Sequence, residues 1–237
     1  MISIIIPAYN EENRIGKTLL SVLDYLAAKR HDFELIVVDD GSADRTVQVV
    51  EGIAAGRSDV KVLRNGANMG KGYSVRNGAL ASRGDVVFFT DADLATPIEE
   101  LERFLAAMNG CDVVIGSRTM PGAKIEVAAP PHRELLGRLF NLFVRLYFGI
   151  SFTDTQCGAK MFSGRAAREI FSRQRLARFA FDVELLYLAR RLGFVVKELP
   201  IHWFHSADTR VRALPDGLRM LADLLLIRAL HRGVRPA

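Results

Sequence analysis

The sequence predicts an α/β fold with a mainly parallel central sheet and helices on both faces. Short runs of apolar and β-branched residues alternate with longer segments whose apolar residues recur at helical spacing. This order of strand, loop and helix repeats through the first half of the chain, which is typical of a parallel sheet with helical crossovers. The 237 residues, 49% hydrophobic and 25% charged, have the composition of one globular domain with a sizeable core.

The first half contains four predicted strands, at 2–6, 33–38, 60–63 and 86–89. Helical spacing of apolar residues predicts helices over about 13–28, 44–54, 73–81 and 97–108. Asn13 is a suitable cap for the first of these helices. Polar turns follow the first, second and fourth strands, so they share the edge of the sheet at which ligands bind in such folds.

The second half is less regular. Strands are predicted at 112–115, 160–162 and 195–199, and helices at 134–148, 164–172, 182–192 and 216–230. The segment 120–131 is rich in Pro, Gly and Ala and is predicted to be a mobile loop. Helices 134–148 and 216–230 each have a broad apolar face, part of which must contact the core or a membrane. Without an internal repeat or a long linker, 1–237 is predicted to be a single domain.

The charge and the cysteines limit the partners and the compartment. A formal net charge of +5 and a pI of about 9.4 favour anionic partners, such as phosphates, nucleic acid or an anionic membrane, without choosing among them. Cys111 and Cys157 are too few for a disulfide framework or a thiolate metal site, so we expect the cytoplasm. We expect neither a signal peptide nor a membrane span, which leaves peripheral membrane attachment.

The predicted strand at 86–89 ends in Thr90-Asp91-Ala92-Asp93. If the backbone stays extended, Asp91 and Asp93 leave from the same face and can converge on one hard cation. The alternative is that the two aspartates only cap a turn between a strand and a helix.

Five motifs follow one another along the chain. They are Ile4-Ile5-Ile6-Pro7-Ala8-Tyr9-Asn10-Glu11-Glu12, Val37-Val38-Asp39-Asp40-Gly41-Ser42, Asn68-Met69-Gly70-Lys71-Gly72, Asp91-Ala92-Asp93 and Gly116-Ser117-Arg118. In this order and spacing the set resembles glycosyltransferase family 2, the inverting nucleotide-sugar enzymes of GT-A fold. The resemblance implies that 1–118 binds the nucleotide sugar and that 119–237, with its amphipathic helices, binds the acceptor.

Three further motifs resemble the dolichyl-phosphate β-glucosyltransferase branch more than the related mannose synthases. They are Asp154-Thr155-Gln156-Cys157-Gly158, Phe181-Asp182-Val183-Glu184-Leu185-Leu186-Tyr187 and His202-Trp203. The mannose synthases have Gln two residues after the second aspartate, where this chain has Ala95. That departure agrees with the glucosyltransferase branch and leaves a bound metal more dependent on phosphate and water ligands.

The resemblance implies a donor site that holds Mg²⁺ or Mn²⁺, with Asp93 as the direct ligand and Asp91 toward the ribose. The residues that it assigns to the nucleotide-sugar pocket are Pro7, Ala8, Tyr9, Glu11, Asp40, Lys71 and Asp91. The carboxylate of Asp40 can accept the imide N–H of uracil, and Tyr9 can pack on the ring. Taken alone, Asp40 could belong to a plain turn, and Lys71 could be a solvated lysine in a glycine-rich loop.

On the acceptor side, the resemblance assigns Arg118, Arg133 and Arg210 to the lipid phosphate and the diphosphate, and guanidinium groups suit phosphate recognition. Asp154 and Gln156 can line the sugar pocket, or they can be buried hydrogen-bonding structure. Asp93, Arg118, Arg133 and Asp154 are the predicted catalytic residues.

The predicted reaction is the transfer of glucose from UDP-glucose to a polyprenyl phosphate at the cytoplasmic membrane face, with inversion to a β-linked product. A phosphomonoester is mostly anionic near neutral pH, so this attack needs no base, whereas a sugar hydroxyl would need one, with Asp154 or Asp182 as candidates. The alternatives are a mannose synthase that uses GDP-mannose, a sugar-phosphate nucleotidyltransferase, and a non-catalytic nucleotide-sugar-binding protein. A membrane partner protein is possible, and no nucleic-acid partner is predicted.

Overall fold

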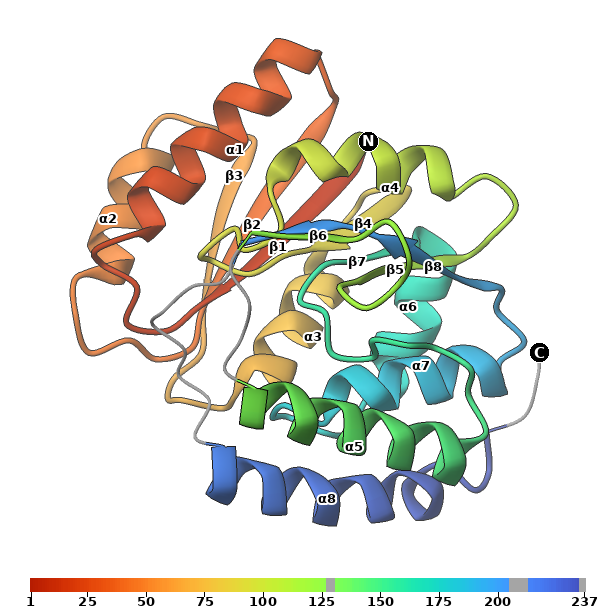
Figure 1. The fold of residues 1–237 in the computed structure, drawn as a ribbon. Coiled ribbons are helices and arrows are strands. Elements are labelled where there is room, and N and C mark those ends of the chain that lie inside the picture. The colour runs from red at the N-terminus through yellow and green to blue at the C-terminus, as the bar shows by residue number, and fades with distance from the viewer. Residues whose placement is uncertain (127–130, 205–212, 235–237) are drawn as a thin grey trace.

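The protein is built on a seven-stranded sheet in the order β3-β2-β1-β4-β7-β5-β8, shown in Figure 1. The computed structural model describes residues 1–126, 131–204 and 213–234. The strands of this sheet are β1 (Ile2–Ala8), β2 (Phe33–Asp39), β3 (Val60–Arg64), β4 (Val86–Phe89), β5 (Val113–Ser117), β7 (Lys160–Ser163) and β8 (Val196–Pro200). A second, two-stranded sheet joins β6 (Lys124–Ile125) to β9 (His202–Trp203).

Helices cover both faces of the large sheet (Figure 1). The helices are α1 (Ile15–Lys29), α2 (Thr46–Ala54), α3 (Lys71–Ala81), η1 (Ile98–Glu100), α4 (Leu101–Ala107), α5 (Pro131–Phe148), α6 (Gly164–Arg173), α7 (Phe181–Arg191) and α8 (Ala213–Leu230). Helices α1, α2 and α4 share one hydrophobic cluster, and α3, α6 and α7 belong to the other. Helices α5 and α8 form an outer layer on the side of α7, and each buries one side in this second cluster, through Val144 and Phe148 of α5 and Met220, Leu224 and Ile227 of α8. The predicted α/β architecture with a mainly parallel sheet is confirmed.

One strand reverses the direction of the sheet, and this reversal matters for the site. The neighbours of β1, β2 and β8 are parallel, but β7 runs antiparallel to both β4 and β5. Because of this reversal, β7 begins at the edge where β4 ends, and Lys160 pairs in register with Phe89. Lys160, from the second half of the chain, therefore lies opposite Phe89, which is two residues before Asp91 in the sequence.

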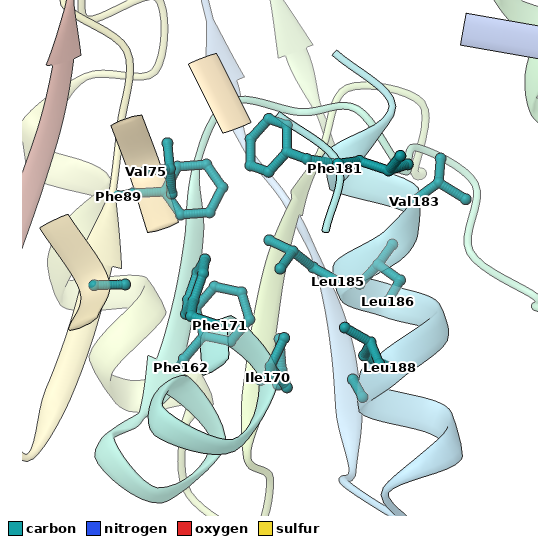
Figure 2. Packing of buried hydrophobic residues seen from close by; sticks show 14 of the residues in the cluster. Val75, Phe89, Phe162, Ile170, Phe171, Phe181, Val183, Leu185, Leu186 and Leu188 are labelled. Carbon is teal, nitrogen blue, oxygen red and sulfur yellow. The ribbon is translucent and has the colours of Figure 1, made fainter. Parts of the chain in front are cut away.

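Aromatic packing anchors the end of β4. The ring of Phe89 stacks on Phe162 of β7 with centroids 6.2 Å apart and lies 6.0 Å from Phe181 at the start of α7 (Figure 2). Phe162 in turn meets Phe171 of α6 edge-on at 5.1 Å. All four rings are fully buried, so the last residues of the strand have little freedom to move.

Two local predictions were wrong. Asn13 does not cap the first helix, because α1 begins at Ile15 and Arg14 occupies the cap position without a side-chain hydrogen bond. The segment predicted as an unstructured loop contains β6, which pairs with β9, and α5 begins within it at Pro131. Residues 127–130 of that loop lie outside the described residues.

Candidate active site

The turn after β4 is the centre of the candidate site. The sequence argument assumed an extended backbone at Asp91 and Asp93. The structure differs, because the chain turns there. The amide of Leu94 donates to the carbonyl of Asp91 at 3.1 Å, and Leu94 has a φ of 47°. Thr18 of α1 donates to the carbonyl of Ala92 at 2.6 Å and supports the turn. The turn, rather than strand alternation, therefore directs the two carboxylates.

Asp91 forms an ion pair with Lys71, whose Nζ lies 2.5 Å from Oδ1 of Asp91. The sequence analysis placed Lys71 in a glycine-rich loop, but Lys71 is the first residue of α3. Gly158 packs against the same carboxylate so closely that a Cβ there would lie 1.9 Å from Oδ2 of Asp91. Burial lowers the pKa of Lys71, but the charges of Asp91 and Asp182 outweigh it and the net pKa is raised. Lys71 therefore stays charged at the edge of the sheet.

Asp93 lies beside this pair. Burial and the negative charge of Asp91 raise its pKa, although the amide of Ala95 donates to Oδ1 at 3.0 Å and Arg14 and Lys71 lower the pKa. Carboxylate oxygens are the ligands that Mg²⁺ and Mn²⁺ prefer. The described residues hold no cluster of three or more potential ligands, so a metal here would take its other ligands from phosphate or water. Two carboxylates, from Asp91 and Asp93, fit a divalent cation that takes its remaining ligands from phosphate or water.

A second buried ion pair, which the sequence did not predict, supports the first. The Nζ of Lys160 is completely buried, contacts the carboxylate of Asp182 and donates to the carbonyl of Cys157 at 2.6 Å. Cys157 precedes Gly158, so Lys160 holds the backbone against which Asp91 packs. Burial raises the pKa of Asp182, and the charges of Lys160 and Lys71 partly offset that rise. Positive and negative charges thus alternate from Lys160 through Asp182 and Lys71 to Asp91.

Arg118 and Asp154 form a third ion pair, and both were predicted to be catalytic. The Nε and Nη2 of Arg118 donate to the two oxygens of Asp154 at 2.6 and 2.9 Å, and its backbone amide donates at 3.0 Å. The guanidinium also lies over the ring of Trp203 at 5.4 Å. Burial raises the pKa of Asp154, but the charge and hydrogen bonds of Arg118 outweigh it and hold the pKa below the ordinary value. Asp154 is therefore a poor general base.

The predicted base pocket is built from two turns that hydrogen bond to each other. The side-chain oxygen of Asn10 accepts from the backbone amide of Ala43, and the backbone amide of Asn10 donates to the hydroxyl of Ser42, both at 2.8 Å. The backbone amide of Asp40 donates to the carbonyl of Ala8 at 2.8 Å. Glu11, which is buried, forms an ion pair with Arg14. Pro7 and Ala8 end β1, and Tyr9 follows directly, so the structure brings these predicted residues to the same edge as Asp91.

Asp40 faces the protein. Its oxygens accept from Asn65, Met69 and Gly70 at 2.8 to 2.9 Å, so it holds the glycine-rich loop that leads into Lys71. Gly70 has a φ of 103°, and a Cβ there would lie 2.5 Å from the carbonyl oxygen of Ala177, which explains the glycine. That Asp40 also receives a base remains a prediction.

The other predicted site residues come from the second half of the chain. The side chain of Gln156 reaches the carbonyl of Phe179 at 3.5 Å, and its amide reaches Asp154 at 3.3 Å. Arg133 lies in the first turn of α5, but its side chain is outside the described residues. Arg210 falls in the segment 205–212, also outside the described residues.

Comparison with known proteins agrees with this geometry. The model of the family described as glycosyl transferase family 2 matches residues 3–171. A dolichyl-phosphate β-glucosyltransferase of Trichomonas vaginalis is 35% identical over 98% of this chain and 74% of its own length. The dolichyl-phosphate β-glucosyltransferase of Homo sapiens is 32% identical over 96% of this chain and 74% of its own.

Among solved structures, glucosyl-3-phosphoglycerate synthase of Mycobacterium tuberculosis, in complex with Mn²⁺, UDP and phosphoglyceric acid, superposes with a TM-score of 0.68. It is 21% identical and covers all of this chain and 80% of its own, a likeness that shows the fold. The fold is GT-A, and the chain belongs to glycosyltransferase family 2. Within that family its sequence resembles the dolichyl-phosphate β-glucosyltransferases.

The Arg118–Asp154 pair gives a prediction about stability and pH. We expect Asp154→Asn to lower the free energy of unfolding at neutral pH by about 2 kcal/mol, a value discounted because Arg118 is one third exposed. Since the pKa of Asp154 is lowered by folding, its contribution is present above the unfolded pKa of about 3.9 and is lost as pH falls through the folded pKa. Urea unfolding of both proteins at several pH values measures this. A stability difference that does not shrink in acid would contradict it.

The Lys160–Asp182 pair gives a second prediction. Lys160→Met leaves a buried carboxylate without its partner and should destabilise the fold by about 3 kcal/mol. The double variant Lys160→Met, Asp182→Asn should regain most of that stability but still bind a nucleoside diphosphate more weakly, because Gly158 and Lys71 lose their support. Thermal unfolding and calorimetric titration with UDP measure the two effects. Full recovery of UDP affinity in the double variant would show that the pair is structural only.

Proposed function

We propose that this protein transfers glucose from UDP-glucose to a polyprenyl phosphate, with inversion at the anomeric carbon. The relatives named dolichyl-phosphate β-glucosyltransferases support the sugar and the lipid acceptor. The acidic turn, with Lys71 beside it at the carboxyl edge of the sheet, supports a nucleotide-diphosphate donor.

The observation that carries the proposal is that both candidate general bases are held in ion pairs. Asp154 is bound by Arg118, and Asp182 is bound by Lys160. A hydroxyl acceptor would need one of these carboxylates to take its proton. A phosphate acceptor needs neither, because it is already mostly anionic near neutral pH. Positioning and charge neutralisation can then supply most of the catalysis.

In the proposed reaction, different residues bind the donor and the acceptor. The turn after β1 and the glycine-rich loop surround the nucleotide, and Lys71 supplies positive charge next to the diphosphate. Asp93, with Asp91 beside it, would hold Mg²⁺ or Mn²⁺, which neutralises charge on the departing diphosphate. Arg118, held flat by Asp154 and Trp203, would face the acceptor phosphate together with Arg133 and Arg210.

The outer layer supports attachment to a membrane surface. We define the outer leucine face as the exposed leucines of α5 and α8 listed here: Leu135, Leu136, Leu139, Leu142, Leu146, Leu221, Leu225, Leu226 and Leu230. Within the described part of the chain, no helix is long and apolar enough to span a membrane. We therefore propose that the protein lies peripherally on the cytoplasmic face, where this surface, with or without a membrane partner protein, brings the site to its lipid substrate.

Incubation with radiolabelled UDP-glucose, Mg²⁺ and a polyprenyl phosphate tests the reaction. The expected result is label in the organic extract as an acid-labile β-linked glucosyl phospholipid. Label from GDP-mannose and none from UDP-glucose would indicate a mannose synthase instead. Release of pyrophosphate from UTP and glucose 1-phosphate would indicate a nucleotidyltransferase.

Replacing Asp93 should lower the activity but raise the stability of the protein without metal. Asp93→Asn should lower the transfer rate at least about a hundredfold, because it removes a charged group at the departing diphosphate. Since burial and Asp91 disfavour the ionised form of Asp93, the same variant without metal should melt at a higher temperature near neutral pH. Differential scanning fluorimetry with and without Mn²⁺ measures the second effect. Retained activity would place the metal elsewhere, and a lower melting temperature would contradict the electrostatic argument.

A further inference from the structure

A groove lined by arginines lies at the carboxyl-terminal ends of α5, α7 and α8, which come together at one end of the molecule (Figure 1). Its volume is about 660 Å³. The groove is lined by Arg190, Arg191, Arg228 and Arg232, with Tyr147 and Tyr187 beside them. None of its lining residues is acidic.

Within the described part of the chain, the hydrogen-bond acceptors of three of these arginines are backbone carbonyls. Arg190 donates to the carbonyl of Phe148 at 2.9 Å, and Arg191 donates to the carbonyl of Val234 at 2.6 Å. Arg228 donates to the carbonyl of Tyr147 and lies over its ring at 4.4 Å. These contacts hold the helix ends together, and the partial negative charge of the carbonyls favours the guanidinium groups, but no carboxylate among the described residues neutralises them.

The contrast with other arginines of the chain is clear. Several arginines on other surfaces meet a carboxylate, as in Arg57 with Asp59 at 2.8 Å, Arg83 with Glu34 at 3.1 Å, and Arg173 with Glu169 at 2.5 Å. Others, such as Arg76, donate to a carbonyl but stand alone, whereas the groove brings four together. In the groove, four guanidinium groups have no carboxylate partner among the described residues. Such a site favours an anion, and the planar hydrogen-bonding edge of guanidinium suits phosphate oxygens.

The groove opens onto the outer leucine face. Leu225 both lines the groove and is 55% exposed, and Leu146 at the end of α5 is 77% exposed. A ligand that matches both surfaces has a phosphate next to acyl chains. We propose that the groove binds the phosphate headgroup of an anionic phospholipid when the outer leucine face rests on a membrane, an inference that rests on the proposed peripheral attachment.

This site is separate from the one that receives the acceptor. Arg133, predicted to bind the acceptor phosphate, lies in the first turn of α5, and the groove lies at its other end. A helix of 18 residues is about 27 Å long, so one lipid phosphate cannot reach both places. A phospholipid bound in the groove would instead fix the orientation of the protein on the surface.

Charge reversal at one groove arginine, compared with reversal elsewhere, tests the proposal. Arg232 is exposed and has no hydrogen-bond or ion-pair partner among the described residues, so Arg232→Glu changes the groove with little effect on packing. Lys17→Glu is the matched control, because Lys17 is exposed on α1, on the other face of the sheet, and the change in net charge is the same. Both variants and the wild type are sedimented with phosphatidylcholine vesicles, with and without phosphatidylglycerol.

We expect Arg232→Glu to weaken binding to the phosphatidylglycerol vesicles about 25-fold, at about fivefold for each unit of charge near the surface. Lys17→Glu should change it several-fold less, and binding to phosphatidylcholine alone should be the same for all three proteins. If Arg232→Glu does not fold, Arg232→Gln replaces it, with Lys17→Gln as its control and an expected loss of about fivefold.

Equal losses in the two variants would overturn the proposal, as would failure of the wild type to prefer anionic vesicles. Displacement of the protein from the vesicles by inorganic phosphate at constant ionic strength would show a site for small anions instead. Glucosyl transfer to a short, detergent-solubilised polyprenyl phosphate is measured in parallel and should be equal in all variants. Absence of transfer in the wild type would refute the proposed reaction without changing the vesicle result.

Discussion

The ion pair between Lys71 and Asp91 is the contact on which the candidate site depends. It joins the first residue of α3 to the turn after β4, and Gly158 from the second half of the chain closes against the same carboxylate. Lys160 and Asp182 lie behind it, fully buried. Lys160 and Asp182 need each other, because an unpaired charge at that depth would cost on the order of 3–5 kcal/mol, whereas Lys71 and Asp91 are partly exposed and their pairing matters less for stability.

This constraint also shapes the chemistry that the site can perform. The carboxylate of Asp154 is a poor proton acceptor because Arg118 lowers its pKa, and that of Asp182 is buried in an ion pair with Lys160. Lysine and arginine held by these carboxylates keep a fixed position and a full charge. Such a site is suited to two anionic substrates, a diphosphate that leaves and a phosphate that attacks. The pKa values of Asp93 and Asp182 are both raised, but Asp182 has Lys160 as its partner, whereas Asp93 has no ion-pair partner among the described residues, and a divalent cation would supply one.

The two helices of the outer layer expose apolar side chains of the kind that the other helices mostly bury. Most helices bury their apolar faces against the sheet, but α5 and α8 bury one side and expose leucines on another. An exposed apolar surface of this extent is costly in water unless something covers it. With the arginine groove at one end of both helices, the two surfaces together have the polarity of a membrane boundary, with apolar contact and phosphate contact side by side.

The sequence by itself determined the order of strands and helices, the edge of the sheet that carries the site, and the family, because these depend on local periodicity and on motifs that are contiguous in the chain. It did not show that the chain turns at Asp91, or that Lys160 supports Asp91 through Gly158. Those contacts join segments far apart in the sequence, and the antiparallel insertion of β7 alone brings them together. The predicted pair of aspartates was present, but only the tertiary structure decided which lysine pairs with Asp91 and which carboxylates are held by Arg118 and Lys160.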